Sequence, residues 1–207
     1  MAGLLSFLLL LQNLNGSEAL RFSHVAEQGY DTSCGLSVLS DLVSRYWDKP
    51  IPEETFLSEW LALHEQREES FTTTSDDTDK DYSISFKDMQ ELLDLQGCTS
   101  KAFRFTYSQL VKAASTYAPL VLHFADREGH FVLCLSAEDE FLVIADPAEG
   151  VYWLSREDFL SRWQGYALLV QVQGHTKQQE VLNTILHETR AKRATLQSLS
   201  SYNSGVR

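Results

Sequence analysis

Basic residues are scarce in this sequence. Its 207 residues hold 17 Lys and Arg against 29 Asp and Glu, a formal net charge of -12 with neutral histidine. Binding to a phosphate backbone draws on clustered Lys and Arg, so this balance argues against nucleic acid as a partner. With 43% hydrophobic residues, the chain can still bury the core of one globular domain.

Cysteine is equally scarce, and its count is odd. The three cysteines are Cys34, Cys98 and Cys134, and none of them belongs to a close Cys-x-x-Cys pair of the kind that binds zinc. We therefore expect no metal site and no cofactor. At most two of the three can pair within the chain, so at least one thiol is left over. Cys98 and Cys134 are interpreted as structural.

No apolar run is long enough to span a bilayer as a helix. The stretch Leu4–Leu11 has eight residues, which suits the hydrophobic region of a signal peptide. Ser17 and Ala19 can occupy the small-residue positions before a cleavage point, although no Lys or Arg precedes the run. We expect residues 1–19 to be a signal peptide, and the mature, exported chain to begin near Leu20. A core helix in a cytoplasmic protein is the alternative.

The first half of the remaining chain has helical periodicity. An amphipathic stripe begins at residue 34, a second helix is expected over 52–63, and a third, near 86–96, is expected to end at Gly97. Residues 64–83 are polar and without periodicity, which predicts an exposed loop.

Most of the acidity lies in residues 53–94, which hold 13 Asp and Glu against three Lys and Arg. A solvated surface is the favoured interpretation, because runs of charge usually face water. A docking surface for a basic partner is the alternative.

The second half of the chain alternates between strands and short helices. Strand-like runs occupy residues 101–105, 119–124, 130–136, 140–146 and 166–170. Thr106 and Ser155 are expected to cap helices between them. Helices first and an antiparallel sheet afterwards predict an α+β fold.

A further helix is predicted at the end of the chain. Leu182, Ile185, Leu186 and Thr189 form one helical stripe, which we expect to dock on the body. The last eight residues, 200–207, are predicted to be disordered. The expected organisation is thus a signal peptide (1–19), one globular domain (20–175) and a C-terminal helix with a disordered tail (176–207).

The strands at 130–136 and 140–146 are joined by a few polar residues, which predicts a hairpin. If the turn centres on Glu138, His130 lies directly opposite Asp146 on the same face of the sheet, with Cβ atoms about 4.5–5.5 Å apart. An aspartate there can hold the imidazole in one tautomer and stabilise its protonated form. Taken alone, Asp146 before Pro147 is typical of a strand ending in a turn. The pairing with His130 favours catalysis.

Cys34 supplies a nucleophile for such a histidine. It is predicted to lie in the first turn of a helix, after the N-cap residues Thr32 and Ser33. The helix dipole and a neighbouring imidazolium both favour a thiolate. Gln28 can donate its side-chain amide to a developing oxyanion. Glutamine, cysteine, histidine and aspartate in this order match a papain-like cysteine hydrolase.

The motifs "QGYDTSCG", "GHFVL", "ADPAEG" and "LSREDFLSRWQGYALLV" resemble those of the bacteriocin-processing peptidases, which cut double-glycine leaders and belong to the papain-like clan. The resemblance covers about residues 22–172. It implies a papain-like fold, with N-terminal helices packed on an antiparallel sheet and the C-terminal helix as an extra element. It also implies an endopeptidase that acts on an exported polypeptide. In that family's scheme Cys34 is the nucleophile, His130 the general base and acid, Asp146 the orienting residue and Gln28 the oxyanion donor.

Two features depart from the family pattern. Ser33 stands where many members have an acidic residue, and the chain has neither a transmembrane helix nor the Walker motif of the exporters that often carry this domain. In the second respect the chain is more similar to the free-standing periplasmic proteases of bacterial functional-amyloid (Fap) secretion systems. Two other functions stay open: an acyl-transfer or amidase enzyme on the same fold, and a catalytically silent substrate-binding module. The intact set of Cys34, His130, Asp146 and Gln28 argues against the silent binding module.

Overall fold

The computed structural model describes residues 22–27, 34–70, 84–125, 129–172 and 177–204, without the side chains of 68–70 and 196–204. Several predictions lie outside these residues: the signal peptide, the N-cap residues Thr32 and Ser33, Gln28, and the loop from residue 71 to 83. In the part of the chain that is described, no helix combines the length and the hydropathy needed to cross a membrane.

The first helix begins at the predicted nucleophile. Helix α2 (Cys34–Asp41) continues directly into η1 (Leu42–Tyr46), a turn of π-helix. Its apolar stripe is buried, since Leu39, Leu42 and Tyr46 are 0% exposed. The predicted amphipathic helix is therefore confirmed, with the wider turn as an addition that periodicity does not reveal.

Helix α3 (Glu53–Ser70) is longer than the sequence predicts, because residues 64–70 are helical and not part of the loop. These residues are mostly Glu, Gln and Arg, which are good helix formers even without an apolar stripe. Arg67 also bonds Asp88 and Glu91 at 2.6 Å each. Both acceptors lie on α4 (Phe86–Leu95), so the pairs tie the extension to a neighbouring helix.

Capping residues set the ends of the shorter helices, and those at Gly97, Thr106 and Ser155 were predicted. A capping box at Ser85 opens α4, and the left-handed Gly97 (φ +69°) follows its end. A second capping box, at Thr106, opens α5 (Tyr107–Tyr117). The Ser155 hydroxyl accepts the Asp158 N–H at the start of α6 (Arg156–Arg162).

Six strands form one antiparallel sheet in the order β1-β6-β2-β3-β4-β5. They are β1 (Thr99–Arg104), β2 (Leu120–Phe124), β3 (His130–Ala137), β4 (Phe141–Asp146), β5 (Gly150–Ser155) and β6 (Trp163–Gln171). The sequence reasoning missed β5. Five of its six side chains are half-buried, so it lacks the alternation that marks a strand.

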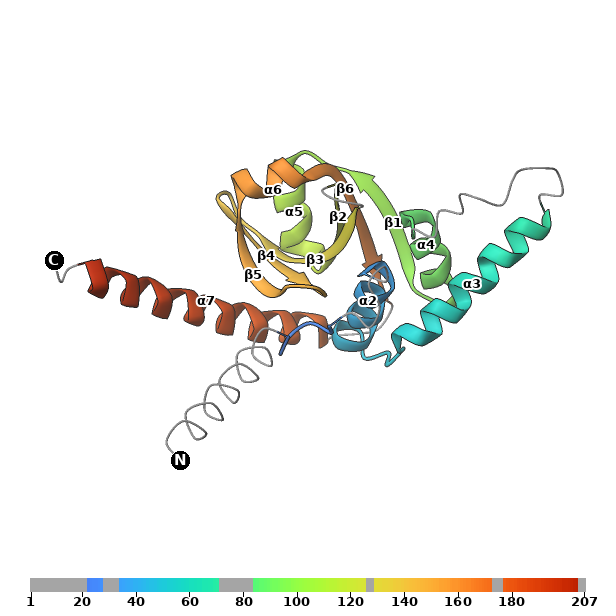
Figure 1. The fold of residues 1–207 in the computed structure, drawn as a ribbon, viewed down its shortest axis with the longest axis horizontal. Helices are drawn as coiled ribbons and strands as arrows, with labels where there is room; N and C mark the ends of the chain where they lie inside the picture. The colour runs from blue at the N-terminus through green and yellow to red at the C-terminus, as the bar shows by residue number, and fades with distance from the viewer. Residues whose placement is uncertain (1–21, 28–33, 71–83, 126–128, 173–176, 205–207) are drawn as a thin grey trace, which may run out of the picture.

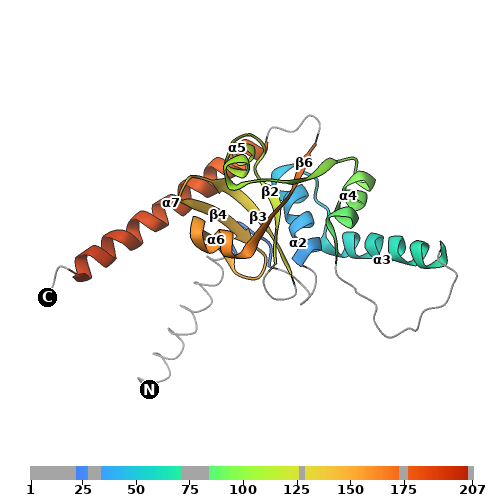
Figure 2. The same cartoon turned by 90° about the horizontal axis from the view of Figure 1, so that it is seen from above.

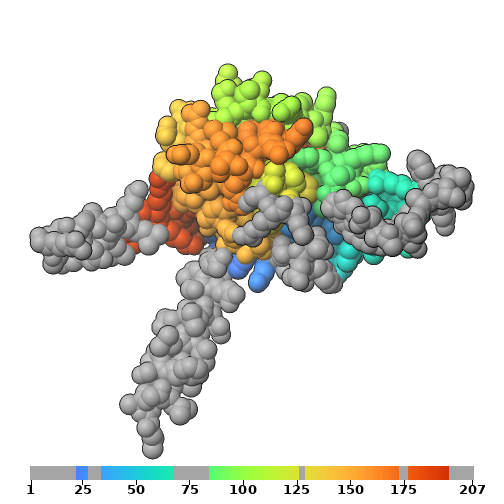
Figure 3. Space-filling model, turned by 45° about the horizontal axis from the view of Figure 1, so that its top comes forward, coloured from blue at the N-terminus to red at the C-terminus, as the bar shows by residue number. Residues whose placement is uncertain are grey.

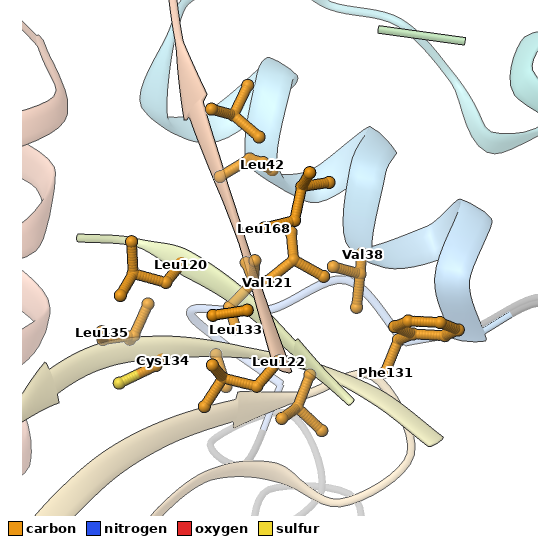
Figure 4. Close-up of a cluster of buried hydrophobic side chains, with 14 of the residues drawn as sticks. Val38, Leu42, Leu120, Val121, Leu122, Phe131, Leu133, Cys134, Leu135 and Leu168 are labelled. Atoms are coloured by element: carbon orange, nitrogen blue, oxygen red, sulfur yellow. The ribbon is translucent and has the colours of Figure 1, made fainter. Parts of the chain in front are cut away.

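Part of the core lies between α2 and one face of the sheet, and part lies on the opposite face, under α5. Alternation along β3 turns Phe131 and Leu133 toward α2, and turns Cys134 toward the opposite face, where α5 packs. Figure 4 shows Val38 of α2 and Leu42 of η1 on the side of the sheet to which Phe131 points. The helix that carries Cys34 is thus fixed against the strand that carries His130.

Helix α7 (Lys177–Ser204) packs along the body with its first half and then projects away from it (Figure 1 and Figure 2). Leu182, Ile185 and Thr189 of the predicted stripe are buried, at 4%, 1% and 7% exposed. The backbone stays helical to Ser204, although the sequence predicts disorder from residue 200. In the space-filling view, α7 (red) emerges on one side of the body, while α3 and α4 (cyan and green) lie on the other (Figure 3).

Candidate active site

Cys34 and His130 meet at one end of the sheet. Cys34 is the first residue of α2 and is half-buried, and His130 is the first residue of β3. The Cys34 side chain lies close enough to the His130 imidazole to raise its pKa. Gly35 makes the close approach of α2 possible, because a Cβ added there would lie 2.3 Å from Ile84 Cγ2 and 3.2 Å from Phe131 Cδ2.

His130 and Asp146 are paired as the sequence predicts, but not in the predicted register. The His130 Nε2 and Asp146 Oδ1 atoms lie 2.8 Å apart. A turn centred on Glu138 would pair Leu133 with Val143. In the structure Leu133 pairs with Ala145, so β4 is displaced by two positions from the predicted register. His130 and Asp146 are therefore diagonal neighbours and not directly opposed. A displacement of two keeps both side chains on the same face, which is why the contact survives.

The charges at the site favour an imidazolium. Burial lowers the pKa of His130, but the hydrogen bonds to Asp146 and Cys34 outweigh it and raise the pKa to about 10. For Asp146, burial acts to raise the pKa, and the bond to His130 overcomes it, so the pKa lies below its ordinary value. Since Asp146 takes Nε2, the other ring nitrogen is left for Cys34.

Asp146 is held by more than the histidine. Its side chain is 1% exposed, and Oδ1 also accepts the backbone N–H groups of Ala148 (2.8 Å) and Glu149 (3.2 Å). The turn that Asp146-Pro147 suggests is therefore present together with the pairing. The other carboxylate oxygen of Asp146, Oδ2, accepts a hydrogen bond from the Tyr152 hydroxyl at 3.3 Å. Sequence reasoning missed Tyr152 because it missed β5.

Gln28 lies outside the described residues, but the segment that leads to it is anchored. The Ala26 N–H donates to Asp41 Oδ1 at 3.1 Å, and His24 bonds Glu188 of α7 at 2.6 Å. Asp41 belongs to the same helix as Cys34. The chain just before Gln28 is thereby tied to the helix that begins at Cys34.

The other cysteines are kept away from this site. All three cysteines, each within the described residues, are free, and Cys98 and Cys134 are 3% and 0% exposed. Burial raises the pKa of Cys98, and it raises the pKa of Cys134 to about 12. Within the described ranges, no three His, Cys, Asp or Glu side chains converge as metal ligands would.

A half-buried cysteine at a helix start, beside a histidine that a buried aspartate holds, is the arrangement of a papain-like cysteine peptidase. The model of the Peptidase C39 family matches residues 23–174, most of the chain. The chain belongs to the Peptidase C39 family. It is a cysteine peptidase, and helix α7 lies beyond the part that the family shares.

Two proteins similar to this chain are named as functional-amyloid proteases. A protein of Pseudomonas fluorescens named "Probable functional amyloid protease FapD" is 27% identical over 79% of this chain and 67% of its own length. Its namesake from Pseudomonas aeruginosa is 25% identical over 76% of this chain and 64% of its own length. The chain thus spans about two thirds of these relatives.

Solved structures of peptidases share the fold. The peptidase domain of Streptococcus ComA, a bi-functional ABC transporter in quorum sensing, aligns with a TM-score of 0.57 over 72% of this chain and 98% of its own, at 18% identity. A double-glycine-motif protease of an AMS/PCAT transporter, solved with its leader peptide, aligns with a TM-score of 0.50 over 70% and 89%, at 20% identity. The predicted papain-like α+β fold is therefore confirmed.

Proposed function

We propose that this peptidase is an endopeptidase that cuts an exported polypeptide, with Cys34, His130 and Asp146 as its catalytic triad. The observation that carries the proposal is the His130 Nε2–Asp146 Oδ1 pair at 2.8 Å, with Cys34 at a helix start beside the same imidazole. The three residues have the types and the order that thiol acyl transfer requires. Membership of a peptidase family directs that chemistry to peptide bonds.

The cleavage proceeds in two stages. The Cys34 thiolate attacks the scissile carbonyl carbon, and the oxygen becomes an oxyanion that the Gln28 amide stabilises by donating a hydrogen bond. The His130 imidazolium then gives its proton to the departing amine, which leaves a thioester on Cys34. A water molecule, losing a proton to His130, hydrolyses the thioester and regenerates the thiolate. Asp146 keeps the imidazole oriented throughout and stabilises its charged form.

The relatives suggest where the substrate is found. Their name couples a protease to functional amyloid, so we propose a secreted or secretion-system polypeptide of that kind as the substrate. Such a substrate fits a periplasmic enzyme released from the signal peptide at residues 1–19. N-terminal sequencing of the periplasmic fraction should find a chain that begins near Leu20, and a full-length chain in the cytoplasm would contradict export.

A comparison of protein termini tests the function. Secreted polypeptides from cells that carry the wild-type chain, Cys34→Ala or Cys98→Ala are compared by mass spectrometry of their termini. Termini that disappear with Cys34→Ala and persist with Cys98→Ala establish a Cys34-dependent peptidase and give its cleavage site. Identical termini in all three strains, with the proteins folded and present, would refute it. Cys98→Ala also removes a cysteine, but a buried one away from the site.

A further inference from the structure

Strand β5 brings one more polar side chain to the buried carboxylate. Asp146 pairs with Gly150 across the β4–β5 turn, and Ile144 pairs with Tyr152, so Tyr152 is the diagonal neighbour of Asp146 on the same face. Its hydroxyl lies 3.3 Å from Asp146 Oδ2. Among the residues that the structure describes, Tyr152 supplies the one hydrogen bond to this oxygen.

The hydroxyl is arranged to donate. A carboxylate can only accept, so the proton of this bond belongs to Tyr152. Arg162, at the end of α6, hydrogen-bonds the Tyr152 side chain and can only donate, which leaves the tyrosine proton for Asp146. Burial, followed by the nearby Asp146 carboxylate, raises the pKa of Tyr152, so the phenol stays protonated wherever the enzyme works.

The strand is itself supported from the other side. The Trp153 indole Nε1–H donates to the Thr189 carbonyl of α7 at 3.4 Å, and the Arg193 guanidinium lies 4.5 Å from the Trp153 ring centroid. Tyr152 and Trp153 are consecutive, so they point to opposite faces of β5. The C-terminal helix thus holds the strand that presents Tyr152 to the active site.

We infer that Tyr152 is a positioning residue for catalysis: by donating to Asp146 Oδ2, it fixes the carboxylate whose other oxygen orients His130. The inference rests on the proposed function. Oδ1 is bonded to His130 and to two backbone N–H groups. Without the Tyr152 hydroxyl, Oδ2 would have no hydrogen-bond partner among the described residues, in a side chain that is only 1% exposed. An unpaired oxygen in that setting disfavours the charged carboxylate.

Tyr152→Phe tests the inference, with Tyr166→Phe as the matched control. Tyr166 is also a strand tyrosine, 42% exposed, and its ring lies 5.5 Å from the Arg104 guanidinium, away from Asp146. Both variants are assayed for kcat and KM across pH on the peptide identified by the comparison of termini. We expect Tyr152→Phe to lower kcat about tenfold with KM nearly unchanged, and to move the acid limb of the profile up by about one pH unit. The charged and titratable groups around Asp146 are His130 of β3, Glu149, and Arg162 behind Tyr152.

The same substitution in the Asp146→Asn variant distinguishes a positioning role of Tyr152 from a purely structural one. In Asp146→Asn, which has no carboxylate to hold, the added Tyr152→Phe change should leave the pH profile where it is. A purely structural role would reduce the melting temperature or the folded fraction of Tyr152→Phe without moving the acid limb, and would refute the inference. A wild-type profile and kcat for Tyr152→Phe would also refute it. Loss of Cys34 dependence, in contrast, would overturn the proposed function itself.

Discussion

Gly35→Ala should damage catalysis more than it damages stability. The added Cβ would lie 2.3 Å from Ile84 Cγ2, 2.8 Å from Met89 Cε and 3.2 Å from Phe131 Cδ2. The methionine end can rotate away, but the isoleucine methyl sits next to its own backbone and forces α2 to move. Overpacking of this kind costs about 1–3 kcal/mol. In the opposite direction, alanine stabilises a helix by about 1 kcal/mol relative to glycine.

Overpacking and helix preference together lower the free energy of unfolding by about 0–2 kcal/mol. For a chain of this size, this corresponds to a fall of at most about 8 °C in melting temperature. A displacement of α2 also moves Cys34, the neighbour of Gly35, relative to His130. A misplacement near 1 Å can reduce the rate about a hundredfold, so we expect kcat/KM to fall by about ten- to a hundredfold.

Ser37→Ala is the matched control for this variant. Ser37 lies on the same helix and is 1% exposed, and its hydroxyl has no hydrogen-bond partner among the described residues. It adds no volume, so activity should stay near wild type and stability should not fall. The two variants are compared by thermal melts and by kcat/KM on the identified peptide. Wild-type activity in Gly35→Ala together with a raised melting temperature would show that α2 is not held by this contact.

Three further predictions concern the oxyanion, the C-terminal helix and pH. Gln28→Ala should lower kcat by about a hundredfold or more if its amide stabilises the oxyanion, and an unchanged kcat would remove it from the site. Ile185→Ala should cost about 2–5 kcal/mol in urea unfolding, because the side chain is 1% exposed, whereas the exposed His187→Ala should change little. Equal, small effects would mean that α7 is not docked. His130 has a pKa raised to about 10, so its pairing stabilises the fold fully below the ordinary value of about 6.5, and this contribution is lost as pH rises through about 10. The stability excess of the wild-type chain over His130→Ala should therefore shrink between those pH values, and a constant excess would contradict the pairing.

Local signals predicted the elements that position the site. Helical periodicity after Cys34 and the capping residues Thr106 and Ser155 were sufficient to place helices where the structure has them. The pairing of His130 with Asp146 was predicted for the right face but from the wrong register. The loop length between two strands does not fix where pairing begins, and the bulge between Cys134 and Ser136 changes the register by one position on the way to the site.

Other features depend on contacts that the sequence does not reveal. The extension of α3 depends on Arg67 reaching α4, which is distant along the chain. Strand β5 is the edge strand of the sheet and its residues are half-buried without alternation, so the contact of Tyr152 with Asp146 could not be foreseen. The turn of π-helix after Asp41 has no recognised sequence signal.

Alkylation of the cysteines tests the central claim, that Cys34 is the nucleophile activated by His130, most directly. Native protein is treated with a limiting amount of iodoacetamide at mildly acidic pH, and peptide mapping by mass spectrometry is followed alongside residual peptidase activity. Cys34 should be labelled first, with activity lost in proportion, because it is half-buried beside an imidazolium, whereas Cys98 and Cys134 are buried. His130→Ala should slow the labelling of Cys34 and leave the other two unchanged. Full activity in protein whose Cys34 is completely alkylated, or labelling of Cys34 no faster than that of Cys98, would contradict the account.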